Sequence, residues 1–109
     1  SNNREFQEIY KKGKRWHCSS FVSHFQSSSK LALAFVASKK IGSAVVRNKI
    51  KRRLRALCLE KSKTSSLKSG RYIFVAKQEI VSKSYDELKK EMNWSLKKLH
   101  NDKISTSVN

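Results

Sequence analysis

The first apolar positions of the chain recur with the period of a helix. Phe6, Ile9 and Tyr10 would lie on one side of such a helix. Gly13 follows them at a position where helices often end in a glycine. The pattern therefore predicts a short helix from Arg4 to Lys12.

The pattern then changes to one that is typical of strands. From Trp16 to Gln26, aromatic and β-branched residues such as Phe21 and Phe25 alternate with small polar ones, which predicts a half-buried strand. The serines at 27–29 indicate a turn. Residues 31–37 are all apolar, which predicts a central strand covered on both faces. We expect a hairpin to join the two strands.

Helical spacing returns in two segments of the second half. Ser43 is placed to cap a helix that runs to about Lys61, and Ser84 with Glu87 forms the capping-box pattern that begins a final helix. Residues 71–76, between the two helices, have the composition of a buried strand. The apolar stripes of the two helices are Val46, Ile50, Leu54, Leu57 and Cys58, and then Tyr85, Leu88, Met92, Leu96 and Leu99.

This order of elements predicts an α+β fold in which helices pack on one sheet. A length of 109 residues suits a single domain with one modest core, which we expect to span residues 1–109. Within it, we predict an ordered core at about residues 4–99 and a frayed tail at residues 100–109. The chain does not begin with methionine, so its first residues carry no weight in the interpretation.

The charge of the chain indicates the class of its partner. It has 25 Lys and Arg against 8 Asp and Glu, a formal net charge of +17, and such self-repulsion favours a polyanion as ligand. A membrane surface also attracts positive charge, but the sequence has neither a long apolar run nor the pattern of a signal peptide. The 38% of hydrophobic residues argues against a disordered basic tail. We therefore expect a folded, cytoplasmic protein that binds nucleic acid.

The sequence offers little for metal binding or acid–base catalysis. Cys18 and Cys58 are far apart and outside any CxxC pair, so we expect two free thiols. His17 and His24 flank Cys18, but the chain adds few ligands beyond Cys58 and His100, whereas structural zinc needs four. We therefore expect no metal site, and we expect the histidines to lie at the surface or in the packing.

The remaining aromatic residues sit in segments with apolar patterns. Trp16 and Tyr72 belong to predicted strands, and Trp94 belongs to the final predicted helix. Large aromatic side chains in such patterns usually fill a core. We therefore predict packing roles for all three.

The helix after Ser43 carries one strongly basic face. At 100° per residue, five polar side chains share an arc roughly opposite the apolar stripe. They are Arg47, Asn48, Lys51, Arg52 and Arg55. No Asp or Glu occurs between Glu8 and Glu60, so the face lacks the acidic partners that support an ordinary solvated helix. Because arginine can bridge phosphate oxygens with two hydrogen bonds, this face favours nucleic acid as its ligand.

Residues 38–55, SKKIGSAVVRNKIKRRLR, are similar to the signature segment of the bacterial ribonuclease P protein subunit family. The shared pattern is a Lys-Lys-Ile-Gly turn, then Arg-Asn, then a Lys-Arg pair and a further Arg at fixed spacing. Residues 4–13 resemble the first helix of that family, and residues 71–77 resemble the strand after its signature helix. The resemblance thus extends over about residues 4–99.

The resemblance implies a fold and an activity. The fold is an α-β-β-β-α-β-α sandwich whose signature helix lies in a left-handed crossover between parallel strands; general principles would predict a right-handed crossover. The activity is removal of the 5′ leader of precursor tRNA, with catalysis by a large RNA that binds magnesium ions. This chain would supply binding, and its partners would be the catalytic RNA and precursor tRNA.

The resemblance also implies two sets of site residues. Contacts with the catalytic RNA are expected from Lys39, Lys40, Arg47, Asn48, Lys51, Arg52 and Arg55. Contacts with the precursor leader are expected from Phe6, Tyr10, Lys11, Lys12, Arg15 and Lys77. The spacing of Phe6 and Tyr10 alone favours a different role, in which the two rings pack the first helix onto the sheet, and both interpretations stay open here.

Two other functions are compatible with parts of the sequence. A ribosomal or other structural RNA-binding protein would share the charge and the basic helix. A metal-dependent nuclease that acts alone would need converging carboxylates, whereas the acidic residues here lie towards the ends of the chain. Cleavage of precursor tRNA with and without a ribonuclease P RNA would separate all three functions.

Overall fold

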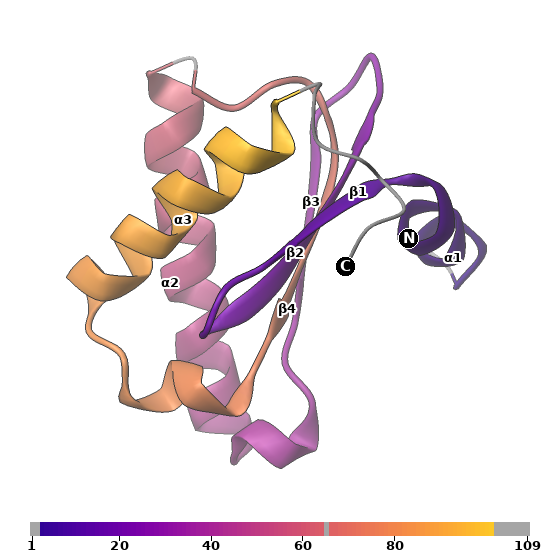
Figure 1. Ribbon diagram of the computed structural model, residues 1–109. Coiled ribbons are helices and arrows are strands. Elements are labelled where there is room, and N and C mark those ends of the chain that lie inside the picture. The colour runs from indigo at the N-terminus through magenta and orange to yellow at the C-terminus, as the bar shows by residue number, and fades with distance from the viewer. Residues whose placement is uncertain (1–2, 65, 102–109) are drawn as a thin grey trace.

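A computed structural model describes residues 3–64 and 66–101 of the chain (Figure 1). The helices are α1 (Asn3–Lys12), α2 (Ala44–Lys63) and α3 (Tyr85–Leu99), with short 3-10 helices η1 (Lys39–Ile41) and η2 (Gln78–Ser82). The strands are β1 (Lys14–His17), β2 (Phe21–Ser27), β3 (Ala32–Val36) and β4 (Gly70–Ala76). They form one sheet in the order β1-β2-β4-β3. The expected α+β fold, with its α-β-β-β-α-β-α order, is confirmed.

The sheet separates two unequal layers of helices. Helices α2 and α3 lie on one face, and α1 lies on the other (Figure 1). Strand β3 pairs with β4 in parallel, whereas the β1–β2 and β2–β4 pairs are antiparallel. The chain passes from β3 through α2 to the adjacent strand β4, and in Figure 1 this path makes a left-handed crossover. The hand opposes the general rule for such units and agrees with the one that the resemblance implied.

The predicted strand from Trp16 to Gln26 is wrong in one respect, because it is two strands joined by a turn. The backbone N–H of Cys18 donates to the carbonyl of Phe21 at 2.8 Å and closes the turn. The backbone N–H and the hydroxyl of Ser20 both donate to the Glu91 carboxylate of α3, at 3.0 and 2.6 Å. This partner, distant in the sequence, explains why local alternation did not reveal the turn.

The prediction of a central strand at residues 31–37 is also wrong. Strand β3 lies at the edge of the sheet, and it forms no hairpin with β2 because β4 lies between them. Leu31 is 45% exposed. The run is apolar because Leu33 and Phe35 pack against the core under α2, while the alternate residues face the α1 side, which α1 covers only in part.

The core fills the space between the sheet and the pair α2 and α3. Both helix starts match the prediction: the Ser43 hydroxyl accepts from Val46 N–H, and Ser84 and Glu87 make both bonds of a capping box. Most of the two predicted stripes is buried, namely Ile50, Leu54, Leu57, Cys58, Leu88, Met92, Leu96 and Leu99. Val46 and Tyr85 are half-buried beside them.

Two expectations about the last helix need correction. Trp94, expected in the core, is 51% exposed because its position on α3 points away from the stripe that packs on α2 and the sheet. His100, placed in the expected tail, packs on the core, and its Nε2 lies 2.7 Å from the Tyr72 hydroxyl. Residues 102–109 of that expected tail lie outside the described residues. None of the helices described is both long and apolar enough to cross a membrane.

Candidate nucleic-acid interface

The basic face of α2 is oriented by the apolar stripe that anchors the helix. With that stripe buried, Asn48, Arg52 and Arg55 are exposed, and Arg47 and Lys51 are half-buried at the margin of the arc. The structure thus brings together all five polar residues predicted for this face.

Local contacts hold several of these side chains in place. The Arg47 Nε–H donates to the carbonyl of Gly42 at 3.2 Å, and the guanidinium of Arg55 lies 5.1 Å from the centroid of the Phe35 ring. Gly42 has φ +154°, a conformation that side chains rarely adopt, and it forms the turn between η1 and α2. This turn places the exposed Lys39 and Lys40 next to the start of the basic face.

The electrostatics of this surface are those of an unneutralised cation cluster. The ion pairs found among the described residues join Arg71 to Glu5 and Glu8, and Lys89 to Glu60. None of them involves the seven residues predicted to contact RNA. A polyanion is therefore the ligand that suits this surface, because the lysines and arginines can displace the counterions condensed on its phosphates.

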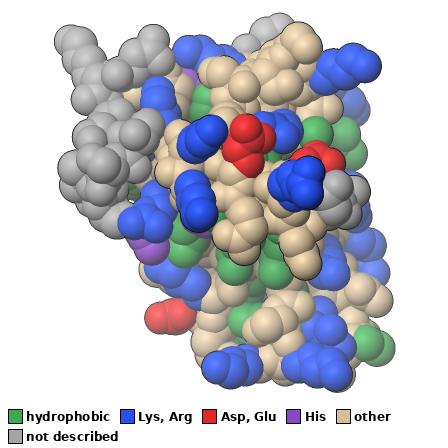
Figure 2. All heavy atoms as spheres, turned by 90° about the vertical axis from the view of Figure 1, so that its right-hand side faces the viewer, with side chains coloured by type: hydrophobic (Ala, Val, Ile, Leu, Met, Phe, Trp, Pro, Cys, Tyr) green, Lys and Arg blue, Asp and Glu red, His purple; other side chains and the backbone are tan. Residues whose placement is uncertain are grey.

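A second surface lies on the sheet face that α1 occupies. The strand register forms three rows of side chains on this face, because residues paired across neighbouring strands share a face. The rows are Gln26, Arg71 and Ala32; then Arg15, His24, Ile73 and Ala34; then His17, Val22, Val75 and Val36. Helix α1 covers the middle row, where Ile73 is fully buried, and leaves the third row, here called the valine row, partly open. Figure 2 shows hydrophobic side chains on this side of the molecule with Lys and Arg around them.

The aromatic pair of α1, Phe6 and Tyr10, borders the valine row. The Phe6 and Tyr10 rings meet edge to face at 6.2 Å, and the Tyr10 ring meets His24 at 4.7 Å. Both rings are half-buried, so they pack on the sheet and also present a surface to solvent. Burial raises the pKa of the Tyr10 hydroxyl above its usual value, which keeps that group neutral.

Comparison of the whole chain with known proteins identifies its family. The family profile described as Ribonuclease P matches residues 1–100. The chain belongs to the ribonuclease P protein family. The ribonuclease P protein component of Nitratiruptor sp. is 38% identical over 96 residues, which cover 88% of this chain and 86% of that protein. That of Bacillus pumilus is 35% identical over 100 residues, with 88% and 82% covered.

Solved structures of ribonuclease P proteins have the same fold. The protein from Staphylococcus aureus superposes with a TM-score of 0.78 at 31% identity, over 93% of this chain and 95% of that one. The protein from Thermotoga maritima, at 22% identity, superposes with a TM-score of 0.73 over 86% and 91%, and this likeness concerns the fold alone. As a family member, the chain is a protein component of ribonuclease P with a role in tRNA 5′ maturation, and it takes part in an endoribonuclease complex with an RNA partner.

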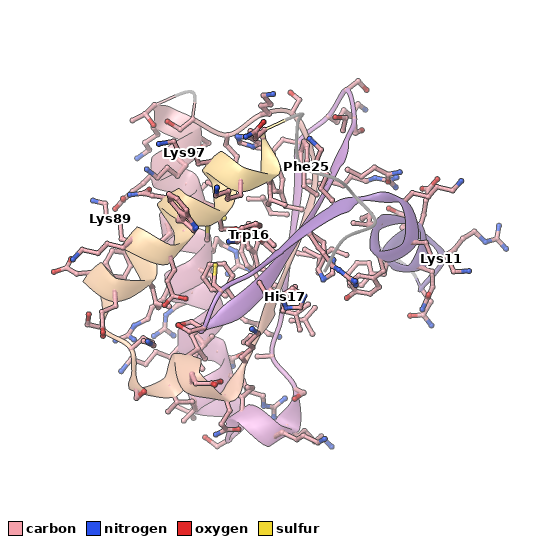
Figure 3. All side chains as sticks on the ribbon, viewed as in Figure 1. Lys11, Trp16, His17, Phe25, Lys89 and Lys97 are labelled. Carbon is pink, nitrogen blue, oxygen red and sulfur yellow. The ribbon has the colours of Figure 1, made fainter. Side chains whose placement is uncertain are left out.

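The residues predicted for the leader do not all gather at the open valine row. Arg15 lies in the row next to it, and Lys77 follows directly after β4, where its Nζ donates to the carbonyl of Cys18. Lys11 and Lys12 are exposed on α1, and Lys11 points away from the sheet (Figure 3). The structure therefore groups Phe6, Tyr10, Arg15 and Lys77 around the row, with Lys11 on the outer side of the helix.

Sequence reasoning missed four residues of this surface. Val22, Val36 and Val75 form its floor, and His17 ends the row. Burial, together with the nearby charges of Lys77 and Arg15, lowers the pKa of His17. Alternation along each strand could have separated the two faces, but only the register brings residues of separate strands into one row.

The side chains of this family member offer no cluster for a metal ion in the described part of the chain. No three His, Cys, Asp or Glu residues gather there. Both thiols are free, and burial raises the pKa of Cys18 and of Cys58 to about 12. Donors of this kind do not fit magnesium, which prefers several oxygen ligands in octahedral geometry.

Proposed function

We propose that this chain binds the catalytic RNA of ribonuclease P through α2 and the 5′ leader of precursor tRNA through the surface beside α1. The observation that carries the proposal is the presence of two basic surfaces on opposite sides of one sheet. The first is the arc of α2 with η1, and the second is the valine row with its aromatic and cationic border. One scaffold can therefore hold two RNA segments at once.

The α2 surface suits a folded RNA. Its arginines can form paired hydrogen bonds with phosphate oxygens, and the side chain of Asn48 can reach a base edge or a ribose hydroxyl. Packing of Arg55 on Phe35 restricts its guanidinium before binding, so less conformational entropy is lost on contact. We assign contacts with the catalytic RNA to Lys39, Lys40, Arg47, Asn48, Lys51, Arg52 and Arg55.

The valine row suits a single strand. A shallow apolar floor accepts any base, and aromatic faces such as Phe6 and Tyr10 stack on bases without sequence preference. Lys77 and Arg15 lie where the phosphates of such a strand would pass. A site of this kind matches leaders of varied sequence, and the exposed Lys12, together with Lys11 on the outer side of α1, would add long-range attraction.

The chemistry of cleavage is assigned to the RNA. Magnesium ions bound to that RNA would activate the water and stabilise the leaving oxygen. The described side chains of this protein contain no cluster of three acidic or metal-ligating groups to hold such ions. The contribution of the protein is then to bind the leader and to neutralise phosphates, so that the RNA works at lower magnesium concentration.

A reconstitution assay tests this proposal. Precursor tRNA would be incubated at low magnesium with a bacterial ribonuclease P RNA alone, with the protein alone, and with both. Cleavage at the 5′ end only in the third mixture is the expected result. Cleavage by the protein alone would indicate a nuclease that acts by itself. Failure to restore cleavage, with RNA binding intact, would indicate a structural RNA-binding protein.

A further inference from the structure

Helix α3 presents a tryptophan to solvent on the outer side of the helical layer. The indole of Trp94 is 51% exposed, whereas the other Phe, Tyr and Trp side chains among the described residues are buried or half-buried. An exposed indole contributes little to the core, and this one lies on the face of α3 opposite Leu88, Met92 and Leu96. Its position therefore needs an explanation other than packing.

Lysines surround this tryptophan. Lys90, Trp94, Lys97 and Lys98 are spaced i, i+4, i+7 and i+8, which places them on one side of the helix. The Nζ of Lys98 lies 4.5 Å from the centroid of the Trp94 ring and 5.4 Å from that of Trp16. A cation is thus held between two aromatic rings, by an attraction of the cation–π kind.

A groove runs beside the ring of Trp94. It has a volume of about 330 Å³, and its lining includes Trp16, Cys18, Lys90 and Glu91. The carboxylate of Glu91 lies in this lining, but it accepts hydrogen bonds from the backbone and hydroxyl of Ser20 and from Ser19. These bonds tie the carboxylate to the β1–β2 turn, and the three lysines at 90, 97 and 98 outnumber it around the ring.

The chemistry of this surface favours RNA over protein as its ligand. A protein-docking patch usually has apolar residues around its aromatic anchor, with charged residues depleted. Here three lysines and one carboxylate, that of Glu91, are the neighbours of the anchor along the helix. A flat indole beside ammonium groups is the combination that binds single strands, since the base stacks on the ring and the cations attract the phosphates.

We propose that Trp94, with Lys90, Lys97 and Lys98, forms a third RNA contact, which stacks one base of a single-stranded RNA segment on the indole. This contact uses side chains outside the two surfaces assigned above, but its groove adjoins the leader surface at the β1–β2 turn, because the lining also includes His17, which ends the valine row. The sheet lies between α3 and α1 (Figure 1), and Lys89 and Lys97 extend from the side of α3 that faces away from the sheet (Figure 3). The proposal does not depend on either of the other two assignments.

The test measures binding of a labelled single-stranded RNA oligonucleotide to the full chain by fluorescence anisotropy. A Phe6→Ala, Tyr10→Ala background removes the competing aromatic pair. In this background, Trp94→Ala should weaken binding about tenfold, towards the lower end of the range for one lost stacked base. Trp94→Phe should recover part of the affinity. Lys30→Ala removes an exposed charge from a turn outside all three surfaces and is the matched control for Lys97→Ala. It should leave the affinity for the oligonucleotide unchanged.

Tryptophan emission gives an independent measurement, because the chain has 2 tryptophans. The difference in emission between the parent and Trp94→Phe reports the environment of Trp94, and stacking of a base should quench it. Quenching on addition of ribonuclease P RNA would identify that RNA as the source of the segment. Quenching only after precursor tRNA is added would identify the substrate, and quenching by the oligonucleotide alone would indicate another RNA.

Two results would overturn the proposal. One is an unchanged oligonucleotide affinity in Trp94→Ala whose unfolding midpoint matches that of its parent. The other is an emission from Trp94 that stays constant at saturating RNA, which would leave a protein partner as the ligand for this surface. Cleavage of precursor tRNA in the reconstitution assay is a separate readout, so failure of the third contact is distinguishable from failure of the proposed function.

Discussion

Replacement of both Phe6 and Tyr10 by alanine tests the leader surface most directly. The double substitution removes two aromatic contacts, at centroid distances of 6.2 and 4.7 Å, each typically worth about 0.5–1.5 kcal/mol. The free energy of unfolding should therefore fall by at least about 1–3 kcal/mol, because the two half-buried rings also lose apolar burial. Binding of the leader should weaken separately, because one stacked base contributes about 1–3 kcal/mol, or roughly 5- to 150-fold in affinity.

The assay compares substrates that differ only in the leader. The affinity of the assembled holoenzyme would be measured for mature tRNA and for precursors with leaders of increasing length, at constant salt and magnesium concentrations. We expect the parent to gain affinity as the leader lengthens and the double variant to lose most of that gain. Affinity for mature tRNA, which has no leader, should stay nearly unchanged in the double variant.

Tyr10→Phe is the matched control, because it keeps the ring that meets His24 and removes only the hydroxyl. It should retain the gain in affinity from the leader. The unfolding midpoint of each variant, measured in denaturant, separates loss of folding from loss of binding. If a folded double variant still gains as much affinity from the leader as the parent does, the two rings serve packing alone and the assignment is wrong.

Three further predictions concern RNA binding and stability. Arg52→Ala, at an exposed position, should weaken binding to ribonuclease P RNA and leave the unfolding midpoint unchanged. Arg53→Ala removes a 3.2 Å hydrogen bond from the guanidinium to the Lys83 carbonyl and should lower the free energy of unfolding by about 1–3 kcal/mol. The opposite pattern in denaturation and binding curves would mean that the binding face is misassigned. The logarithm of the affinity for that RNA should fall steeply with the logarithm of salt concentration, and the slope should decrease by about one for each contacting Lys or Arg removed, so a flat plot would contradict phosphate contacts. Burial, followed by the charges of Arg15 and His17, lowers the pKa of His24 from 6.5 to about 4, so the unfolded chain binds the proton first as pH falls. Between pH 6.5 and about pH 4, the free energy of unfolding should therefore drop by about 1.4 kcal/mol per pH unit. Urea denaturation of the parent and of His24→Gln at several pH values checks this, and equal pH slopes in both would refute it.

The elements that could be predicted from the sequence are those with local signals. The starts of α2 and α3 are encoded by the hydroxyls of Ser43 and Ser84, which bond to backbone groups three residues away. The break between β1 and β2 depends instead on Glu91, which lies 71 residues from Ser20. The edge position of β3 likewise depends on its pairing with β4, which no local pattern encodes.

The same distinction applies to the candidate sites. The basic arc of α2 belongs to one helix, so its spacing predicts the surface that the structure forms. The valine row comes from three strands, and Val22, Val75 and Val36 meet only through the register of the sheet. Trp94 was expected in the core because its helix is amphipathic, but its place around the helix axis puts it on the outer side.

Strand β3 connects two surfaces that belong to different ligands in the proposed function. Phe35 faces α2 and contacts the guanidinium of Arg55, while its neighbours Ala34 and Val36 face the opposite side of the sheet. Because a shift of one residue in a strand exchanges its two faces, a single insertion or deletion within β3 would move Phe35 towards the leader and a small residue towards α2. A single substitution in this strand therefore changes one face, whereas a change in its length would alter both of the proposed RNA contacts together.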